Sequence, residues 1–177
     1  MIELAFHHKE ELNRQYANMM LNSAKYKYVL ARNWTLYELD IENSNWNKIQ
    51  LVSVTHDPYH IHGYFKCDVN RAVHYAYGLV VINFDDKPSI TFANDFKKIL
   101  HMLIFEFKFN KLQFACVVGN PAEQLYDRLI NRYSGRIVGV YKSDVKLLDN
   151  EIYDLKLYEI TRTAILNNLC LKRRHSI

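Results

Sequence analysis

The most informative segment of the chain is residues 112–126, Leu-Gln-Phe-Ala-Cys-Val-Val-Gly-Asn-Pro-Ala-Glu-Gln-Leu-Tyr. Residues 112–118 alternate as a strand with both faces largely apolar, which is typical of a strand inside a sheet. Gly119, Asn120 and Pro121 break this strand, and Pro121 suits the first turn of a helix because its missing N–H needs no partner there. A short helix follows, with Tyr126 near its start. In α/β proteins, a strand that opens into a helix tends to lie at a ligand site.

The rest of the chain shows further strand and helix periods. We expect strands at residues 2–6, 48–55, 61–69 and 76–84, and two more after residue 135, the last at 155–160. We expect one or two helices within residues 8–31, a loop or short helical turn within 33–47, a strongly amphipathic helix at 92–107 and a terminal helix at 162–172. The order is therefore strand, helices, three strands, helix, strand, helix, two strands and a final helix.

Composition favours one globular domain that does not associate with membranes. The chain has 177 residues, 49% of them hydrophobic, and can bury a core without disulfides. Its three cysteines are widely spaced, which favours a reducing compartment, and residues 1–8 carry no signal pattern. No apolar run approaches the roughly 20 residues of a membrane span. We therefore expect a cytoplasmic protein, whose net charge of +4 allows an acidic partner without selecting one.

The last third of the chain resembles the GCN5-related N-acetyltransferase (GNAT) superfamily, most closely its ribosomal-protein N-acetyltransferase-like branch. That branch carries Asn-x-x-Ala-x-x-Leu-Tyr after its fifth strand, then a glycine near the helix end and a long closing hairpin. The matching residues here are Pro121, Ala122, Leu125, Tyr126, Gly135, Gly139 and the turn at residues 149–154. The resemblance implies an α+β fold in one domain, residues 1–177. Its sheet would be mixed, mostly antiparallel, of about six or seven strands, splayed between strands four and five, with helices on both faces.

Two departures from the family pattern concern coenzyme A. Gly119 holds the place of the family's Asn, and Asn120 follows it. The family binds the pyrophosphate with an Arg/Gln-x-x-Gly-x-Gly/Ala loop, where this chain has Lys-Pro-Ser-Ile-Thr-Phe-Ala at residues 87–93. Both glycines, which let the backbone approach phosphate closely, are missing. Lys87, the hydroxyls of Ser89 and Thr91, and the free N–H groups of the helix start remain to bind the phosphates.

The resemblance implies that acetyl-CoA is the co-substrate and that an amine attacks the thioester directly. The pantetheine arm would lie in the splay, along the edge of the fourth strand, where Val81, Ile82 and Asn83 are the expected contacts. A backbone N–H near Val81 or Ile82 would polarise the thioester carbonyl. Tyr126 matches the family's general-acid tyrosine, and a phenol with its ordinary pKa of about 10 is protonated at neutral pH.

Each expected site residue also has a purely structural interpretation. Tyr126 is one of 13 tyrosines and could serve packing alone. Asn120 either contacts coenzyme A or caps the helix. Lys87 either binds phosphate or is simply solvated, and Ser89 and Thr91 are common helix starters.

The general base and the acceptor stay open. His74, Glu38 and Asp68 are base candidates by chain position alone, because reach to the substrate decides that role. The acceptor would be a small-molecule or peptide amine. It would meet residues 12–47 and 136–154, which are rich in tyrosine and mixed charge but carry no readable code.

Two other clusters suggest different functions. His56, His60 and His62 offer three imidazoles, but their spacing matches no metal motif and no carboxylate partner is implied, so we expect no metal site. The basic tail at residues 172–177 is more typical of solvated charge than of a nucleic-acid contact. The main alternative to an enzyme is a GNAT-fold binding or interaction module without turnover, and a nucleic-acid-associated protein is a third hypothesis.

Overall fold

The computed structural model describes residues 1–22, 27–28, 38–44, 46–87 and 89–174. Its elements, in chain order, are β1 (Ile2–Leu4), η1 (Ala5–His8), α1 (Lys9–Asn22), β2 (Lys48–His56), β3 (Tyr59–Asn70), β4 (Tyr75–Asn83), α2 (Ile90–His101), η3 (Met102–Glu106), β5 (Lys111–Val117), α3 (Glu123–Tyr133), β6 (Arg136–Lys146), β7 (Ile152–Thr161) and α4 (Arg162–Arg174).

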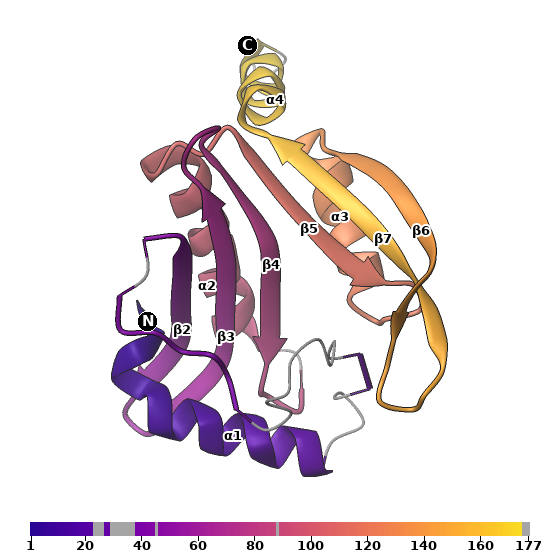
Figure 1. Cartoon of the computed structure of the whole chain (residues 1–177). Helices are drawn as coiled ribbons and strands as arrows, with labels where there is room; N and C mark the ends of the chain where they lie inside the picture. The colour runs from indigo at the N-terminus through magenta and orange to yellow at the C-terminus, as the bar shows by residue number, and fades with distance from the viewer. Residues whose placement is uncertain (23–26, 29–37, 45, 88, 175–177) are drawn as a thin grey trace.

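The strands of the described residues form one sheet in the order β1-β2-β3-β4-β5-β7-β6. Neighbouring strands are antiparallel except β4 and β5, which are parallel because α2 and η3 cross between them. This confirms the predicted α+β fold and its mixed, mostly antiparallel sheet. The parallel strands β4 and β5 diverge toward their C-terminal ends (Figure 1).

Helices cover both faces of the sheet, as predicted, because the side chains of each strand alternate between two cores. Leu51 of β2 and Phe65 of β3 pack with Phe96 and Ile99 of α2 in the larger core. The next residue of β2, Val52, packs on the opposite face with Leu12 of α1. Figure 1 shows α2 and α3 behind the sheet and α1 across its front. Ser53 of β2 lies on the α2 side as well, since its hydroxyl donates to Asp95 of α2 over 2.8 Å.

Several element boundaries differ from the prediction. The first strand ends at Leu4 rather than residue 6, because a 3-10 turn begins at the fully buried Ala5. The helix expected within residues 8–31 is α1, which ends at Asn22; residues 23–26 and 29–31 lie outside the described residues. Of the predicted loop at 33–47, residues 33–37 and 45 lie outside them as well. The long helix at 92–107 changes to a π-helical turn, η3, after His101.

Candidate active site

The site is a cleft that opens where β4 and β5 part. The two strands pair only at Tyr75–Lys111 and Ala76–Leu112, so the predicted splay is confirmed. The cleft has a volume of about 280 Å³. Its β4 wall is formed by residues 79–82. The opposite wall is formed by β5, the turn after it, the start of α3 and one residue of β7, namely Ala115, Cys116, Val117, Asn120, Ala122, Tyr126 and Leu155. Within the described residues no strand pairs with the β4 edge beyond Ala76 on this side, so backbone groups there face the cleft.

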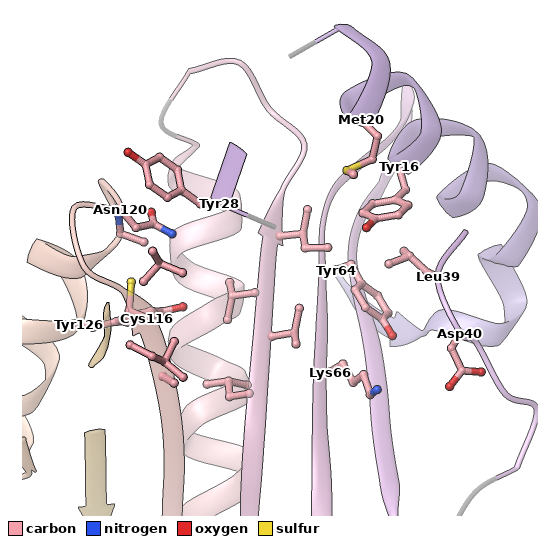
Figure 2. A pocket seen from close by; sticks show the side chains of 18 of the residues that line it. Tyr16, Met20, Tyr28, Leu39, Asp40, Tyr64, Lys66, Cys116, Asn120 and Tyr126 are labelled. Atoms are coloured by element: carbon pink, nitrogen blue, oxygen red, sulfur yellow. Dashed lines mark hydrogen bonds between the residues drawn. The ribbon is translucent and has the colours of Figure 1, made fainter. Parts of the chain in front are cut away.

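Tyr126 lies one turn into α3 and is 7% exposed. Its ring packs edge-to-face on Phe114, with ring centroids 5.1 Å apart, and on Tyr158 at 5.9 Å. Figure 2 shows its hydroxyl pointing toward Cys116 and the gap between β5 and β4. Burial, with a smaller contribution from Cys116, raises the pKa of Tyr126 above that of a free phenol. The hydroxyl is therefore held in its protonated form, which is the form that donates a proton.

Cys116 contributes its thiol to the same wall of the cleft. Burial raises the pKa of this thiol to about 12. A thiol with so high a pKa is a weak nucleophile at neutral pH. Cys116 therefore lacks the thiolate that a covalent cysteine intermediate requires.

The residues expected along the β4 edge do not all face the cleft. Val81 and Ile82 line it. Asn83 does not, because it pairs with Gly63 of β3 and its side-chain oxygen accepts the N–H of Asp85 at 3.0 Å. Asn83 thus closes the end of β4 and shapes the loop that follows.

The start of α2 brings the three predicted phosphate ligands into one short segment. Ser89 caps the helix, since its hydroxyl accepts the N–H of Phe92 at 3.2 Å, and it also donates to the Asp85 carboxylate. The structural interpretation of Ser89 is therefore correct, and its hydroxyl is already engaged. Lys87 and Thr91 are exposed beside it.

Asn120 lies on the rim of the cleft in Figure 2. Its side-chain oxygen accepts the N–H of Ala122 at 2.9 Å, so it orders the turn that starts α3. The capping interpretation is therefore correct for the oxygen. The position leaves the side-chain amide at the mouth of the cleft.

A second wall of the cleft lies across β4, and part of it comes from residues 12–47, the first of the two segments expected to meet the acceptor. Tyr16 of α1, Tyr64 of β3, Lys66 and Asp40 line it (Figure 2), together with the carboxylate of Glu38. Tyr28 lies on the other side of β4, beside Asn120 in Figure 2, where it packs against Val117 and Leu155. Asp40 is bound to Lys48 at 2.8 Å, and this hydrogen bond holds the pKa of Asp40 below its usual range. The only sequence signal for this wall was the tyrosine content of residues 12–47. The packing of α1 against β3 and β4 joins segments that are far apart in the sequence, so no local pattern indicates it.

The three base candidates lie in different places. Glu38 lines the cleft. The His74 ring lies in the β3–β4 turn, where its Nε2 is 2.9 Å from the carbonyl oxygen of Phe107, beyond the paired end of the splay. Asp68 lies beside Gly78, at the bulge of β4. Of the three, Glu38 is the one that lines the cleft.

The histidine cluster divides into two separate groups. His56 lies 2.6 Å from Glu3, together with His8 on the other oxygen of that carboxylate. His60 and His62 instead meet Asp85, a partner that the sequence did not imply. The register of β3 and β4, in which Gly63 pairs with Asn83, is the signal that would have placed Asp85 there.

The C-terminal helix, α4, contributes no residue to the cleft lining among the described residues. α4 extends through Arg174, so part of the predicted basic tail continues a helix, and residues 175–177 lie outside the described residues. Among the helices that the structure describes, none has the length and apolarity to cross a bilayer. The cytoplasmic location stays a prediction, as does the exclusion of nucleic acid.

The fold just described is that of GNAT acetyltransferases. No protein-family model and no curated protein matches the sequence. Among solved structures, spermidine N-acetyltransferase from Vibrio cholerae in complex with CoA and spermine superposes with a TM-score of 0.73 at 14% identity, over 94% of this chain and 97% of that one. A mutant form of the Vibrio cholerae spermidine N-acetyltransferase SpeG gives 0.70 at 14% identity, over 94% and 98%. A probable acetyltransferase gives 0.65 at 15% identity, over 92% of each chain. At these identities the likeness shows the fold, and the ribosomal-protein branch stays a prediction.

Proposed function

We propose that this protein is an N-acetyltransferase that transfers the acetyl group of acetyl-CoA to a primary amine. The observation that carries the proposal is the early end of β4–β5 pairing at Ala76 and Leu112, with a cleft beyond it. A sheet normally pairs along its whole length, because unpaired backbone groups are costly to bury. A cleft with a strand edge on one side and a buried phenol on the other suits an extended amide-containing chain such as pantetheine.

The proposed reaction needs no covalent intermediate. Pantetheine lies along residues 79–82, and a backbone N–H near Val81 or Ile82 stabilises the oxyanion that forms on the thioester carbonyl. The amine nitrogen bonds to the carbonyl carbon and the carbon–sulfur bond breaks. Tyr126 donates its proton to the leaving thiolate, and Glu38 accepts the proton that the amine loses.

Coenzyme A phosphates would bind at the start of α2. Lys87 supplies a positive charge there, Thr91 a hydroxyl, and the helix its free N–H groups. Ser89 contributes through its cap and through Asp85, rather than by a free hydroxyl. Asn120, on the opposite rim, would donate its side-chain amide to the cofactor.

The acceptor wall favours a cationic amine. The rings of Tyr16 and Tyr64 and the carboxylate of Glu38 lie on this second wall, while the charge of Asp40 is balanced by Lys48. Aromatic faces and a carboxylate attract ammonium groups, including those of an amine with a second positive charge. The Vibrio cholerae enzyme with a similar fold is described in complex with spermine. A polyamine is therefore the first acceptor to test here, ahead of a peptide amine.

A GNAT-fold binding module without turnover is the second candidate. It is favoured by one feature, the glycine-free start of α2 with Asp85 beside it, which lowers the attraction for phosphate. Such a module would keep the cleft but bind coenzyme A weakly or not at all.

One pair of measurements separates these candidates. Isothermal titration with coenzyme A reports binding, and thiol release from acetyl-CoA with spermidine or a lysine-containing peptide reports turnover. The enzyme proposal expects saturable binding and thiol release that depends on the amine. Weak or absent binding supports the module and contradicts the cofactor site, whereas saturable binding without release from either amine contradicts turnover with these acceptors.

A further inference from the structure

A second cluster of functional groups lies at the hairpin of β2 and β3. His60 and His62 are two residues apart on β3, and both side chains contact the same carboxylate, that of Asp85. Their rings approach edge-to-face, with centroids 4.6 Å apart. Between them lies Asp85 from the loop that joins β4 to α2. The three ligand atoms of this His60–His62–Asp85 cluster all lie within 4.8 Å of one another.

Each oxygen of Asp85 faces a different imidazole. Oδ1 is 2.6 Å from Nε2 of His60, and Oδ2 is 3.0 Å from Nδ1 of His62. A tetrahedral ion with bonds of about 2.0 Å separates its ligand atoms by about 3.3 Å. Small side-chain rotations would therefore convert these contacts into coordination of one shared ion, without movement of the backbone.

The neighbours of the cluster hold its members in place. The second nitrogen of His62, Nε2, lies 2.9 Å from the hydroxyl oxygen of Thr55. With Nδ1 bound to a metal, Nε2 carries the hydrogen and donates it to Thr55, which is the usual outer support of a metal-binding histidine. Asp85 is fixed by the Ser89 hydroxyl and by its own N–H, which donates to Asn83. Thr55 also pairs with His60 across the hairpin.

We propose that His60, His62 and Asp85 bind one divalent transition-metal ion of the Zn²⁺ class, with the fourth position open to water. Two imidazoles and one carboxylate suit Zn²⁺, whereas Ca²⁺ and Mg²⁺ prefer sets of oxygen ligands. The ion joins the β2–β3 hairpin to the loop that precedes α2. His56 takes no part, because its Nε2 is engaged with Glu3.

The test is a Zn²⁺ titration of the whole chain by calorimetry, after removal of any histidine tag and treatment with chelator. We expect one Zn²⁺ per chain. His62→Ala and Asp85→Asn should each weaken Zn²⁺ binding by more than about tenfold, and Thr55→Val by about tenfold through loss of the outer hydrogen bond. Mg²⁺ in place of Zn²⁺ should give no saturable heat.

The matched control is His56→Gln, which removes an imidazole from the same hairpin and should leave Zn²⁺ affinity within about twofold of the parent value. If His62→Ala does not fold, His60→Gln, at a side chain that is 47% exposed, replaces it in the comparison. The proposal is overturned if the parent chain binds no Zn²⁺, or if His56→Gln lowers the affinity as much as the cluster variants do. The titration contains no coenzyme A, so its result is independent of the acetyltransferase proposal.

Discussion

Ala76 of β4 faces Leu112 of β5, and this is the last pair that joins the two parallel strands. Beyond it the strands have different neighbours: β4 stays paired with β3, and β5 with β7 as far as Val117. Each half of the sheet is thus complete on one side and open toward the cleft. The divergence creates space for a ligand without breaking either half of the sheet.

Filling the cleft should weaken cofactor binding. Ala115 of β5 lines the cleft, and Ala115→Phe would place a ring where the proposal puts pantetheine. We expect coenzyme A affinity to fall by more than about tenfold, together with a modest loss of stability from overpacking. Calorimetric titration measures the affinity, and circular dichroism checks the fold.

Gln113→Phe is the control for that substitution. Gln113 lies two residues earlier on β5, where it pairs with Glu159 of β7, and it does not line the cleft. Its affinity for coenzyme A should stay within about twofold of the parent value. Equal losses in both variants would mean that bulk anywhere on β5, rather than in the cleft, impairs binding.

Removing the Tyr126 hydroxyl should lower turnover and spare binding. A general acid commonly contributes about 10²-fold or more, so we expect Tyr126→Phe to reduce kcat by about that factor with coenzyme A affinity nearly unchanged. Steady-state kinetics and titration give the two values. Tyr133→Phe, near the end of the same helix, is the control. An unchanged kcat in Tyr126→Phe would remove the acid role and leave the fold account intact.

The pH dependence of turnover gives a separate test of Tyr126. Burial raises the pKa of this phenol above its ordinary value, so the proton-donating form persists to higher pH than for a free tyrosine. We therefore expect no alkaline fall in kcat between about pH 7 and pH 10 from the acid. A rate profile at saturating substrates measures this. A decline centred near pH 8 would point to a different proton donor.

The charge of Lys87 should contribute to binding of the coenzyme A phosphates and not to binding of the pantetheine arm. An exposed lysine contributes little to an ion pair, so Lys87→Ala should weaken coenzyme A binding by only about two- to fivefold. Pantetheine, which lacks the pyrophosphate, should bind the variant and the parent equally. Parallel titrations with both ligands make the comparison. A loss of pantetheine affinity would show that the substitution disturbs the cleft itself.

Asp95 should make the fold sensitive to acid. Burial disfavours its charge, but hydrogen bonds from Ser53 and Lys98 outweigh this effect and lower the pKa of Asp95 below 3.8. A carboxyl group whose pKa is lowered in the folded state stabilises the fold at pH values above its unfolded-state pKa. This contribution is lost as the pH falls through the lower, folded-state pKa. Asp95→Asn should cost about 1–3 kcal/mol at pH 7 and less near pH 2. Urea unfolding at both pH values measures the difference, with the exposed Asp86→Asn as control.

Local patterns predicted most of the fold. The alternation of residues 112–118 and the break at Gly119 identified β5 and the start of α3. This was possible because a strand and the turn after it are determined by residues that are adjacent in the sequence. The mixed sheet, its splay and the place of Tyr126 at the cleft were predicted from the resemblance of the last third of the chain to the GNAT superfamily. The change to a π-helical turn at Met102 was missed, because the apolar face of the predicted helix continues through it.

Contacts between distant segments were beyond the reach of these patterns. The approach of Tyr16 and Tyr64 to the cleft depends on how α1 crosses the sheet, and no sequence period encodes that angle. Asp85 meets His60 and His62 only through the β3–β4 register, which two adjacent aromatic strands do not specify on their own. In two predicted cofactor contacts, Asn83 and Ser89, the side-chain oxygen instead accepts a hydrogen bond from a nearby backbone N–H.

A crystal structure with coenzyme A bound would show whether the cofactor lies in the splay of the sheet. We expect electron density for pantetheine between β4 and β5, hydrogen-bonded to the backbone of residues 79–82, with the sulfur near the Tyr126 hydroxyl. Density for the cofactor elsewhere on the protein, with the cleft empty or closed, would contradict this expectation.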